Sequence, residues 1–370
     1  MNTCAKERRL FAGTNSGYGF FSLFYHIAGP EAEHIFLLKG GPGTGKSTLM
    51  DTIGKKMLLK GEEVEFFFCS SDSDSLDAIF LPSCKIAVIA ATAPHVMDPV
   101  HPGAVEEIVN LADCWQEEEL KKSRERITFI NREKARLFNN TYIYLSAALG
   151  FLSGLRQQYK EIKALDQKGL ANIAREIASD IEAQSKKIIK NRPPVERHLF
   201  ASALTPAGPV HHLQNLAGHL EQVYLLHGET GTGKRTLLEK TYQFVRLLEL
   251  DREVFHCGLD AKRIEHLILP QLNLGIFTSE EPHCLTETKA TRIISTAPYH
   301  SNLPKNLQQE RRELQDIYNK TIELACQNLN KAKMYHQELE EIYARQVDFS
   351  QVEKKKDYIL SKIKLMLPKK

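Results

Sequence analysis

Two glycine-rich segments contain residues whose types and spacing suit phosphate binding. The first, residues 40–47, reads GGPGTGKS and fits the pattern G-x-x-x-x-G-K-[ST]. Glycines let the backbone wrap closely around phosphate oxygens, and a following helix adds free N–H groups and its positive dipole end. We expect Lys46 to reach the β- and γ-phosphates as a catalytic residue, and Ser47 to give its hydroxyl to Mg²⁺. The residues expected to bind the nucleotide are Gly40, Gly41, Pro42, Gly43, Thr44, Gly45, Lys46, Ser47 and Thr48.

The second segment, residues 228–236, reads GETGTGKRT and differs at one consequential position. Arg235 stands where a metal-binding hydroxyl is expected, and Thr236 cannot replace it because one helical step turns a side chain by about 100°. We expect this segment to bind phosphate, with Arg235 offsetting the lost Mg²⁺ charge, and to hydrolyse poorly or not at all. A structural remnant is the alternative. The expected binding residues are Gly228, Glu229, Thr230, Gly231, Thr232, Gly233, Lys234, Arg235 and Thr236.

A hydrolytic site of this kind usually adds an acidic residue at the end of a neighbouring strand. The apolar run at residues 86–91 ends without one, and its counterpart ends just before Glu280 and Glu281. Asp72 follows the run at residues 64–69, at the sheet edge where ligands usually bind, so we select it as a catalytic residue and a second Mg²⁺ ligand. The alternative makes Asp72 the N-cap of a helix that begins near Ser73.

Histidine and cysteine also follow strand-like runs in both halves. His95 recurs as His283, which fits either a phosphate-sensing or proton-transfer role or a structural one. Cys69 and Cys257 end equivalent runs, but no ligand spacing along the chain supports a metal site.

The two glycine segments belong to an internal duplication. Residues 34–49 recur as residues 222–237, with an offset of 188 residues. The same offset relates further pairs, namely Cys69 and Cys257, Asp72 and Asp260, Asp77 and Glu265, and His95 and His283. Two prolines within residues 191–194 place the junction there, because proline interrupts helices.

Each copy has the order strand, glycine loop, helix, strand and strand. The expected strands are residues 35–38, 64–69, 86–91, 223–226, 254–257 and 272–277, and the expected helices are residues 47–60 and 236–250. Continuous apolar runs are typical of parallel strands buried on both faces. We therefore predict the α/β class, with two P-loop NTPase parallel-sheet domains from an internal duplication, each followed by a helical region. The expected boundaries are 1–115, 116–190, 191–300 and 301–370.

The helical regions, about residues 104–190 and 305–366, are rich in Glu, Lys, Gln, Leu and Ala. We expect each to pack on its own sheet with a solvated outer face; an arm that binds a protein partner is the alternative. Residues 350–353 spell a capping box for the last helix. The amphipathic tail, residues 354–370, is expected to dock in the core rather than on a membrane.

Composition excludes several classes of protein. The 370 residues are 42% hydrophobic and 26% charged, which excludes a disordered or fibrous chain. We find neither an apolar run that spans a bilayer nor an export signal, and a net charge of +3 gives no nucleic-acid signal. Seven scattered cysteines without a CxxC pair argue against disulfides or a zinc ribbon and favour the reducing cytoplasm.

Four stretches carry a family resemblance: FAGTNSGYGFFSLF, LKGGPGTGKST, CSSDSDSLDAIFLP and TAPHVMDPVHPGAVEEIVNLADCW. They resemble an uncharacterised bacterial family of tandem P-loop ATPases, over essentially the whole chain. The resemblance implies a duplicated P-loop NTPase fold and ATP binding. The chain departs from the family at Ala90 and Ala91, where members carry an acidic residue, and at Arg235, where they tend to carry serine.

Together these features predict an ATP-binding protein that hydrolyses ATP slowly with Mg²⁺ at the first site, with a regulatory or degenerate second site. We expect the purpose of nucleotide binding and hydrolysis to be mechanical coupling to the helical regions. The enzyme alternative is a phosphotransferase, in which Asp72 or Asp74 positions an acceptor hydroxyl. The other alternative is a nucleotide-responsive scaffold without turnover. A hexameric AAA+ motor is disfavoured because we can assign no arginine finger.

Overall fold

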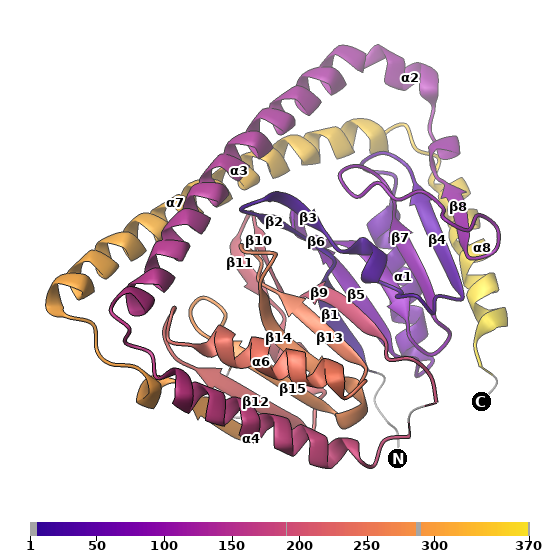
Figure 1. The fold of residues 1–370 in the computed structure, drawn as a ribbon. Helices are drawn as coiled ribbons and strands as arrows, with labels where there is room; N and C mark the ends of the chain where they lie inside the picture. Colours follow the sequence, from indigo (N-terminus) through magenta and orange to yellow (C-terminus); the bar gives the residue numbers. More distant parts are fainter. Residues whose placement is uncertain (1–5, 190, 286–289, 369–370) are drawn as a thin grey trace.

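The structure, a computed structural model, describes residues 6–189, 191–285 and 290–368. Within them, a twelve-stranded sheet has the order β16-β12-β15-β14-β13-β9-β1-β5-β6-β7-β4-β8 (Figure 1). The first-half strands are β1 (Glu7–Phe11), β4 (His34–Lys39), β5 (Val64–Cys69), β6 (Asp72–Leu81), β7 (Ile86–Ala90) and β8 (Glu106–Asn110). The second-half strands are β9 (Glu196–Phe200), β12 (Gln222–His227), β13 (Arg252–His256), β14 (Ile264–Leu269), β15 (Leu274–Ser279) and β16 (Arg292–Ser295). Two hairpins lie apart from this sheet: β2 (Gly13–Ser16) with β3 (Gly19–Ser22), and β10 (Ser202–Thr205) with β11 (Gly208–His211).

The two halves have the same strand order. From edge to middle, the first half reads β8, β4, β7, β6, β5, β1 and the second reads β16, β12, β15, β14, β13, β9. β1 and β9 meet antiparallel through Phe11 and Phe200. The sequence repeat is thus accompanied by a repeat of topology, but the halves share one continuous sheet in place of two separate ones.

The prediction of parallel sheets is wrong at one strand in each half. β6 is antiparallel to β5 and β7, and β14 is antiparallel to β13 and β15. The short link explains β6, because only Ser70 and Ser71 join it to β5, and such a link forms a hairpin. The helix-cap interpretation of Asp72 is also wrong, since Asp72 begins β6. The glycine-loop strands β4 and β12 do have parallel neighbours on both sides.

The core is continuous across the middle of the sheet. Every residue of β7 is buried, as its unbroken apolar run predicts. One apolar cluster contains residues of both halves, among them Leu10, Phe67, Leu199 and Phe255. A further cluster lies in each half. The halves are therefore not independent in their packing.

Four buried charged residues form an ion-pair network across the boundary between the halves. Arg8 pairs with Glu65 and, at 2.5 Å, with Glu253. Arg197 pairs with Glu65 at 2.7 Å and with Glu253 at 3.1 Å. These side chains are 1–11% exposed. Each half supplies one arginine and one glutamate, and each arginine pairs with the glutamates of both halves, so the network links the two halves.

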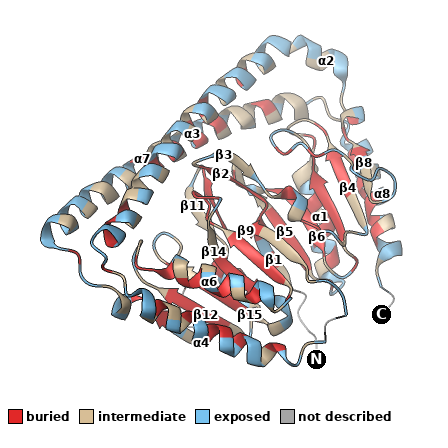
Figure 2. Ribbon diagram, viewed as in Figure 1, coloured by how far each residue is buried: buried red, intermediate tan, exposed pale blue. Residues whose placement is uncertain are grey.

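The two predicted glycine-loop helices are confirmed as α1 (Lys46–Leu59) and α6 (Lys234–Leu247). α3 (Arg124–Glu161) and α7 (Lys305–Ala344) run side by side in opposite directions along one flank (Figure 1). The other α-helices in the described residues are α2 (Glu117–Lys122), α4 (Gln167–Ser185), α5 (Leu213–Gly218) and α8 (Phe349–Met366). Short 3-10 helices are η1 (Phe24–His26), η2 (Ala112–Cys114), η3 (Pro270–Leu272) and η5 (Ala297–Tyr299). Figure 2 shows buried strands beside long helices that are exposed over much of their length.

The terminal helix of each helical region is exchanged between the halves. α4 follows the first half, yet Ile177 and Ile181 join the second-half cluster around α6. α8 follows the second half, yet Val352 and Ile359 join the first-half cluster around α1. The prediction that each region packs on its own sheet is therefore wrong for α4 and α8. The reason is length: helices of 38 and 40 residues are about 57–60 Å long and carry the chain to the other half.

The last helix, α8, packs in the core as predicted but begins at a different residue. Asp348 is the N-cap of α8 and accepts from the N–H of Ser350 at 3.0 Å, so the capping box at residues 350–353 is wrong. The apolar face of α8 is buried, which confirms docking in the core.

The described residues contain no helix with the length and apolar character needed to cross a membrane. The six cysteines among them are free thiols, and Cys4 lies outside the described residues.

Candidate functional site

The first glycine loop, residues 40–45, links β4 to α1. Gly43 and Gly45 have φ of +67° and +79°, which other residues adopt at a cost. Gly45 is the N-cap of α1, and its end of the helix has no side-chain cap. The first N–H groups of α1 are therefore available to an anion, as is the positive end of the helix dipole.

Lys46, the first residue of α1, folds back over this loop. Its Nζ donates to the carbonyl oxygens of Gly40 at 2.9 Å and Gly41 at 2.6 Å. Burial lowers the pKa of Lys46 to about 8, against the attraction of Glu340 and Asp77. A phosphate on the loop would give this buried ammonium the negative partner that stabilises its charge.

Ser47 fits the role of a magnesium ligand. Its Oγ accepts a hydrogen bond from the N–H of Leu76 at 2.9 Å. A hydroxyl oxygen has two lone pairs, so one remains for a metal. Thr48 follows on α1, while Thr44 braces the loop by donating to the carbonyl oxygen of Gly41 at 2.8 Å.

Asp72 is held by a cation from the other end of the chain. Lys333 of α7 lies 2.6 Å from its Oδ1, and the Ser75 hydroxyl donates to its Oδ2 at 2.6 Å. Burial works to raise the pKa of Asp72, but the hydrogen bonds from Lys333 and Ser75 outweigh it and hold the pKa below its ordinary value. Lys333 also pairs with Asp74 at 3.6 Å. Both acids considered in the sequence analysis are therefore engaged by α7.

The end of α7 lies directly on the first loop. A Cβ added to Gly43 would meet the carbonyl oxygen of Glu340 at 2.3 Å, and one added to Gly41 would meet Tyr343 at 3.1 Å. The ring of Tyr343 packs on Trp115, with centroids 5.5 Å apart. The loop of the first half thus contacts a helix that follows the second half.

The second glycine loop, residues 228–233, repeats this construction between β12 and α6. Gly231 and Gly233 have φ of +95° and +106°, and Gly233 caps α6 without a side-chain hydrogen bond. Lys234 Nζ donates to the carbonyl oxygens of Gly228 and, at 3.0 Å, Glu229. Burial lowers the pKa of Lys234, and Glu280 opposes that shift. The two loops therefore share two glycines of positive φ at equivalent positions and the placement of their lysines.

The residues after Lys234 differ from those after Lys46. Arg235 Nε lies 2.6 Å from Glu239 of the same helix, so its charge is already paired. Thr236 lines a cavity of about 390 Å³ beside the loop. That volume is within the range of small-molecule sites.

Charged side chains from several elements line this cavity. They include Arg156 of α3, Arg263, and Glu265 of β14. Burial raises the pKa of Glu265 to about 7, and burial lowers the pKa of Arg263. The cavity therefore combines cations with a carboxyl group that is partly neutral near pH 7.

Glu280 is a site residue to which the sequence analysis assigned no role. It follows β15, the parallel neighbour of the glycine-loop strand β12. Its carboxylate accepts from Lys234 at 2.8 Å and from the hydroxyl of Thr230. The signal was its place directly after a strand, where an acidic partner is expected. The equivalent residue of the first half is Thr92. The first half therefore has the Ser47 hydroxyl but no acid after its strand, whereas the second half has Glu280 but an arginine in place of that hydroxyl.

The histidines and cysteines singled out from the sequence are buried or partly buried. The ring of His95 stacks on Phe24, with centroids 4.5 Å apart. Burial lowers the pKa of His283 to about 4. Burial also raises the pKa of Cys69 well above its ordinary value and that of Cys257 to about 12. Both shifts oppose formation of the thiolate.

One comparison with known families gave a match. A family model described as Nephrocystin 3, N-terminal, matches residues 24–144, about a third of the chain. Searches among curated proteins and among solved structures gave no match. The matched part contains the first glycine loop, the strands β4 to β8 and the start of α3. This part of the chain is therefore similar to a nephrocystin N-terminal domain, and the match does not extend to the second half.

Proposed function

We propose that the first glycine loop binds a nucleoside triphosphate and hydrolyses it slowly with Mg²⁺. The observation that carries the proposal is the placement of Lys46 across its loop, beside two glycines of positive φ and the uncapped start of α1. The motif resemblance given above favours ATP as the nucleotide.

In this proposal each residue has a defined task. The loop N–H groups hold the β-phosphate, Lys46 neutralises the β- and γ-phosphates, and the Ser47 oxygen offers a ligand to the metal. Bound Mg²⁺ would supply further positive charge to the phosphate oxygens. β7 ends at Ala90, and Ala91 and Thr92 follow, so this strand end has no carboxylate to orient water. Turnover is therefore expected to be slow.

The exchanged helices support a coupling role. The phosphates would approach the loop that the backbone of Glu340 touches, and Lys333 on the same helix holds Asp72. Nucleotide binding would thus compete with or adjust the contact of α7. Because α7 follows the second half and pairs along its length with α3, the shift would reach both halves.

The second loop is proposed as a regulatory site for a phosphate-bearing ligand. Lys234 and the adjoining cavity support binding, while Arg235 offers no hydroxyl for a metal at the position that Ser47 occupies in the first half. We expect binding there without Mg²⁺ dependence.

The test is Mg²⁺-dependent ADP formation by the purified full chain and three variants. Lys46→Ala should abolish turnover, whereas Lys234→Ala should retain it. Lys55→Ala is the matched control, because Lys55 lies on the same helix but its side chain is 67% exposed. Turnover that survives in Lys46→Ala would refute the assignment of the first loop.

One alternative has specific support. A nucleotide-responsive scaffold that binds without turnover is favoured by Ala90 at the end of β7 and by Arg235. It predicts that wild-type chain binds MgATP but forms no ADP above the level of Lys46→Ala. The phosphotransferase alternative has less support, because Asp72 and Asp74 both pair with Lys333.

A further inference from the structure

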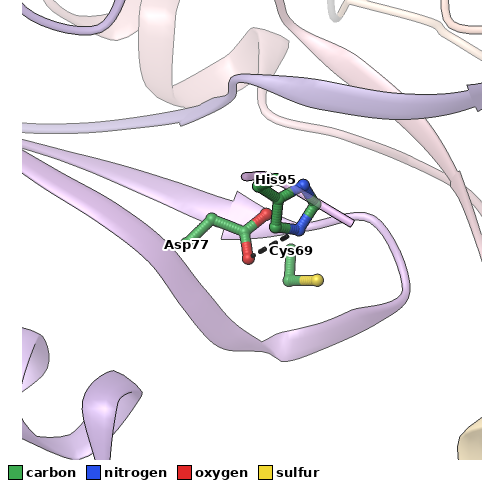
Figure 3. Close-up of side chains that lie close together, drawn as sticks. All are labelled: Cys69, Asp77 and His95. Carbon is green, nitrogen blue, oxygen red and sulfur yellow. Dashed lines mark ion pairs between the residues drawn. The ribbon is translucent and has the colours of Figure 1, made fainter. Parts of the chain in front are cut away.

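A cysteine, an aspartate and a histidine lie close together in the first half. Cys69 ends β5, Asp77 lies within β6, and His95 follows β7 (Figure 3). One ligand atom from each lies within 4.8 Å of the other two. Asp77 and His95 are 5% and 7% exposed. Three consecutive strands thus bring three metal-ligating residue types into one small volume.

An irregularity in the sheet places Asp77 in this cluster. Between β5 and β6, Phe67 pairs with Ala78 but Phe68 pairs with Leu76, so Asp77 is an extra residue in a bulge. A bulge redirects a side chain that regular alternation would place elsewhere. Regular pairing between β5 and β6 is therefore interrupted at the residue that presents this carboxylate.

The separation of Asp77 and His95 matches that of two zinc ligands. His95 Nε2 lies 3.4 Å from Asp77 Oδ1. Ligand atoms about 2.0–2.1 Å from a tetrahedral zinc ion are about 3.3–3.4 Å apart. A sulfur and a nitrogen on the same ion are about 3.6 Å apart, so Cys69, whose sulfur lies within 4.8 Å of the other two ligand atoms, needs to approach by at most about 1 Å. Cys69 is only partly buried, which leaves its side chain room to do so.

The cluster also has polar atoms that lack partners. Asp77 Oδ2 and His95 Nδ1 are buried without a hydrogen bond. A buried polar atom in that state costs about 1–3 kcal/mol, and such atoms are rare in folded proteins. A cation beside Asp77 would remove part of that cost. The His95 ring stacks on Phe24 and contacts the tilted ring of Phe20, and these contacts hold the imidazole in place.

We propose that Cys69, Asp77 and His95 form a zinc site with one open coordination position. Thiolate, carboxylate and imidazole together suit Zn²⁺ better than Mg²⁺, which prefers oxygen ligands. On binding, the Cys69 thiol loses its proton to solvent and the sulfur bonds to the metal as thiolate. Three protein ligands leave the fourth position for water or a ligand oxygen. The site is distinct from the proposed Mg²⁺ position at Ser47.

The second half provides a matched comparison. Cys257, Glu265 and His283 occupy the equivalent positions, and Glu265 lies in the equivalent bulge. Among the described residues, however, the close grouping of three ligand atoms is found only for Cys69, Asp77 and His95. We therefore expect the metal in the first half.

The test uses the full chain, stripped with a chelator and titrated with Zn²⁺ against a chromophoric competitor. We expect one ion per chain with a sub-micromolar dissociation constant. Co²⁺ in place of Zn²⁺ should give the charge-transfer absorption of a cobalt–thiolate bond. Cys69→Ser should remove that absorption and weaken Zn²⁺ binding at least about 100-fold, because even indirect supports of a metal site contribute 10–100-fold. Cys257→Ser should leave both readouts unchanged.

Two results would overturn the proposal. One is a wild-type chain that takes up no stoichiometric Zn²⁺ at micromolar concentration, a readout that does not depend on any variant folding. The other is a cobalt–thiolate absorption that persists in Cys69→Ser, or that disappears in Cys257→Ser. Neither readout involves nucleotide, so failure here is separable from failure of the proposed ATP site.

Discussion

Replacing Glu65 with glutamine should weaken the fold at the boundary between the halves. The side chain of Glu65 is 1% exposed and accepts from both Arg8 and Arg197. In Glu65→Gln the two guanidinium groups share only Glu253, so one buried positive charge is left uncompensated. Removing one member of a buried ion pair costs about 3–5 kcal/mol. We expect a loss near 3 kcal/mol, because the glutamine oxygen can still accept one hydrogen bond.

The assay is urea unfolding followed by far-ultraviolet circular dichroism, since urea leaves charges unscreened. Glu63→Gln is the control, because Glu63 and its partner Lys6 are 34% and 38% exposed and 3.5 Å apart. An exposed pair contributes at most about 1 kcal/mol. The double variant Arg8→Met with Glu65→Met removes one charge of each sign, and should recover most of the loss. A loss below about 1 kcal/mol in Glu65→Gln would refute the argument that the network joins the halves.

Three other changes test the cavity beside the second glycine loop, the exchanged helices, and the contact of α7 with the first glycine loop. The pKa of Glu265 is about 7 in the folded chain against an ordinary value of 4.5, so stability that is fully present below about pH 4.5 is lost as the pH rises through 7. Glu265→Gln should therefore flatten the pH dependence of stability. In urea unfolding at pH 8, this variant should be more stable than the wild-type chain by up to about 3 kcal/mol. Ile359→Ala should cost about 2–5 kcal/mol because that side chain is 0% exposed, whereas Leu365→Ala, at 85% exposure, should cost under about 0.5 kcal/mol. Gly43→Ala should speed amide hydrogen exchange near Glu340, because its Cβ would meet the carbonyl oxygen there at 2.3 Å; unchanged exchange would contradict the contact.

Local features of the fold were predictable from the sequence. The strand before each glycine loop and the helix after it follow from apolar runs and from the position of Lys46 and Lys234. Burial of α8 follows from the spacing of its apolar residues. These features depend on residues close together in the chain, which is why the pattern alone identifies them.

Features that depend on tertiary contacts were not predictable. β6 begins at Asp72 with the polar run DSDS, which is typical of a turn or helix start, and only pairing with β5 makes it a strand. The exchange of α4 and α8 depends on the long helices α3 and α7, which carry the chain from one half of the sheet to the other. The role of Glu280 becomes visible only when β15 pairs with β12. Likewise, Cys69, Asp77 and His95 meet because a bulge turns Asp77 toward the other two.

The central claim is that the first glycine loop binds a nucleoside triphosphate through Lys46. The most direct test is calorimetric titration of MgATP into the full chain, Lys46→Ala and Lys234→Ala. The account predicts that Lys46→Ala weakens binding at the first site at least about 100-fold, or about 2.7 kcal/mol, while Lys234→Ala leaves that site intact. Unchanged affinity in Lys46→Ala, with binding lost only in Lys234→Ala, would contradict it.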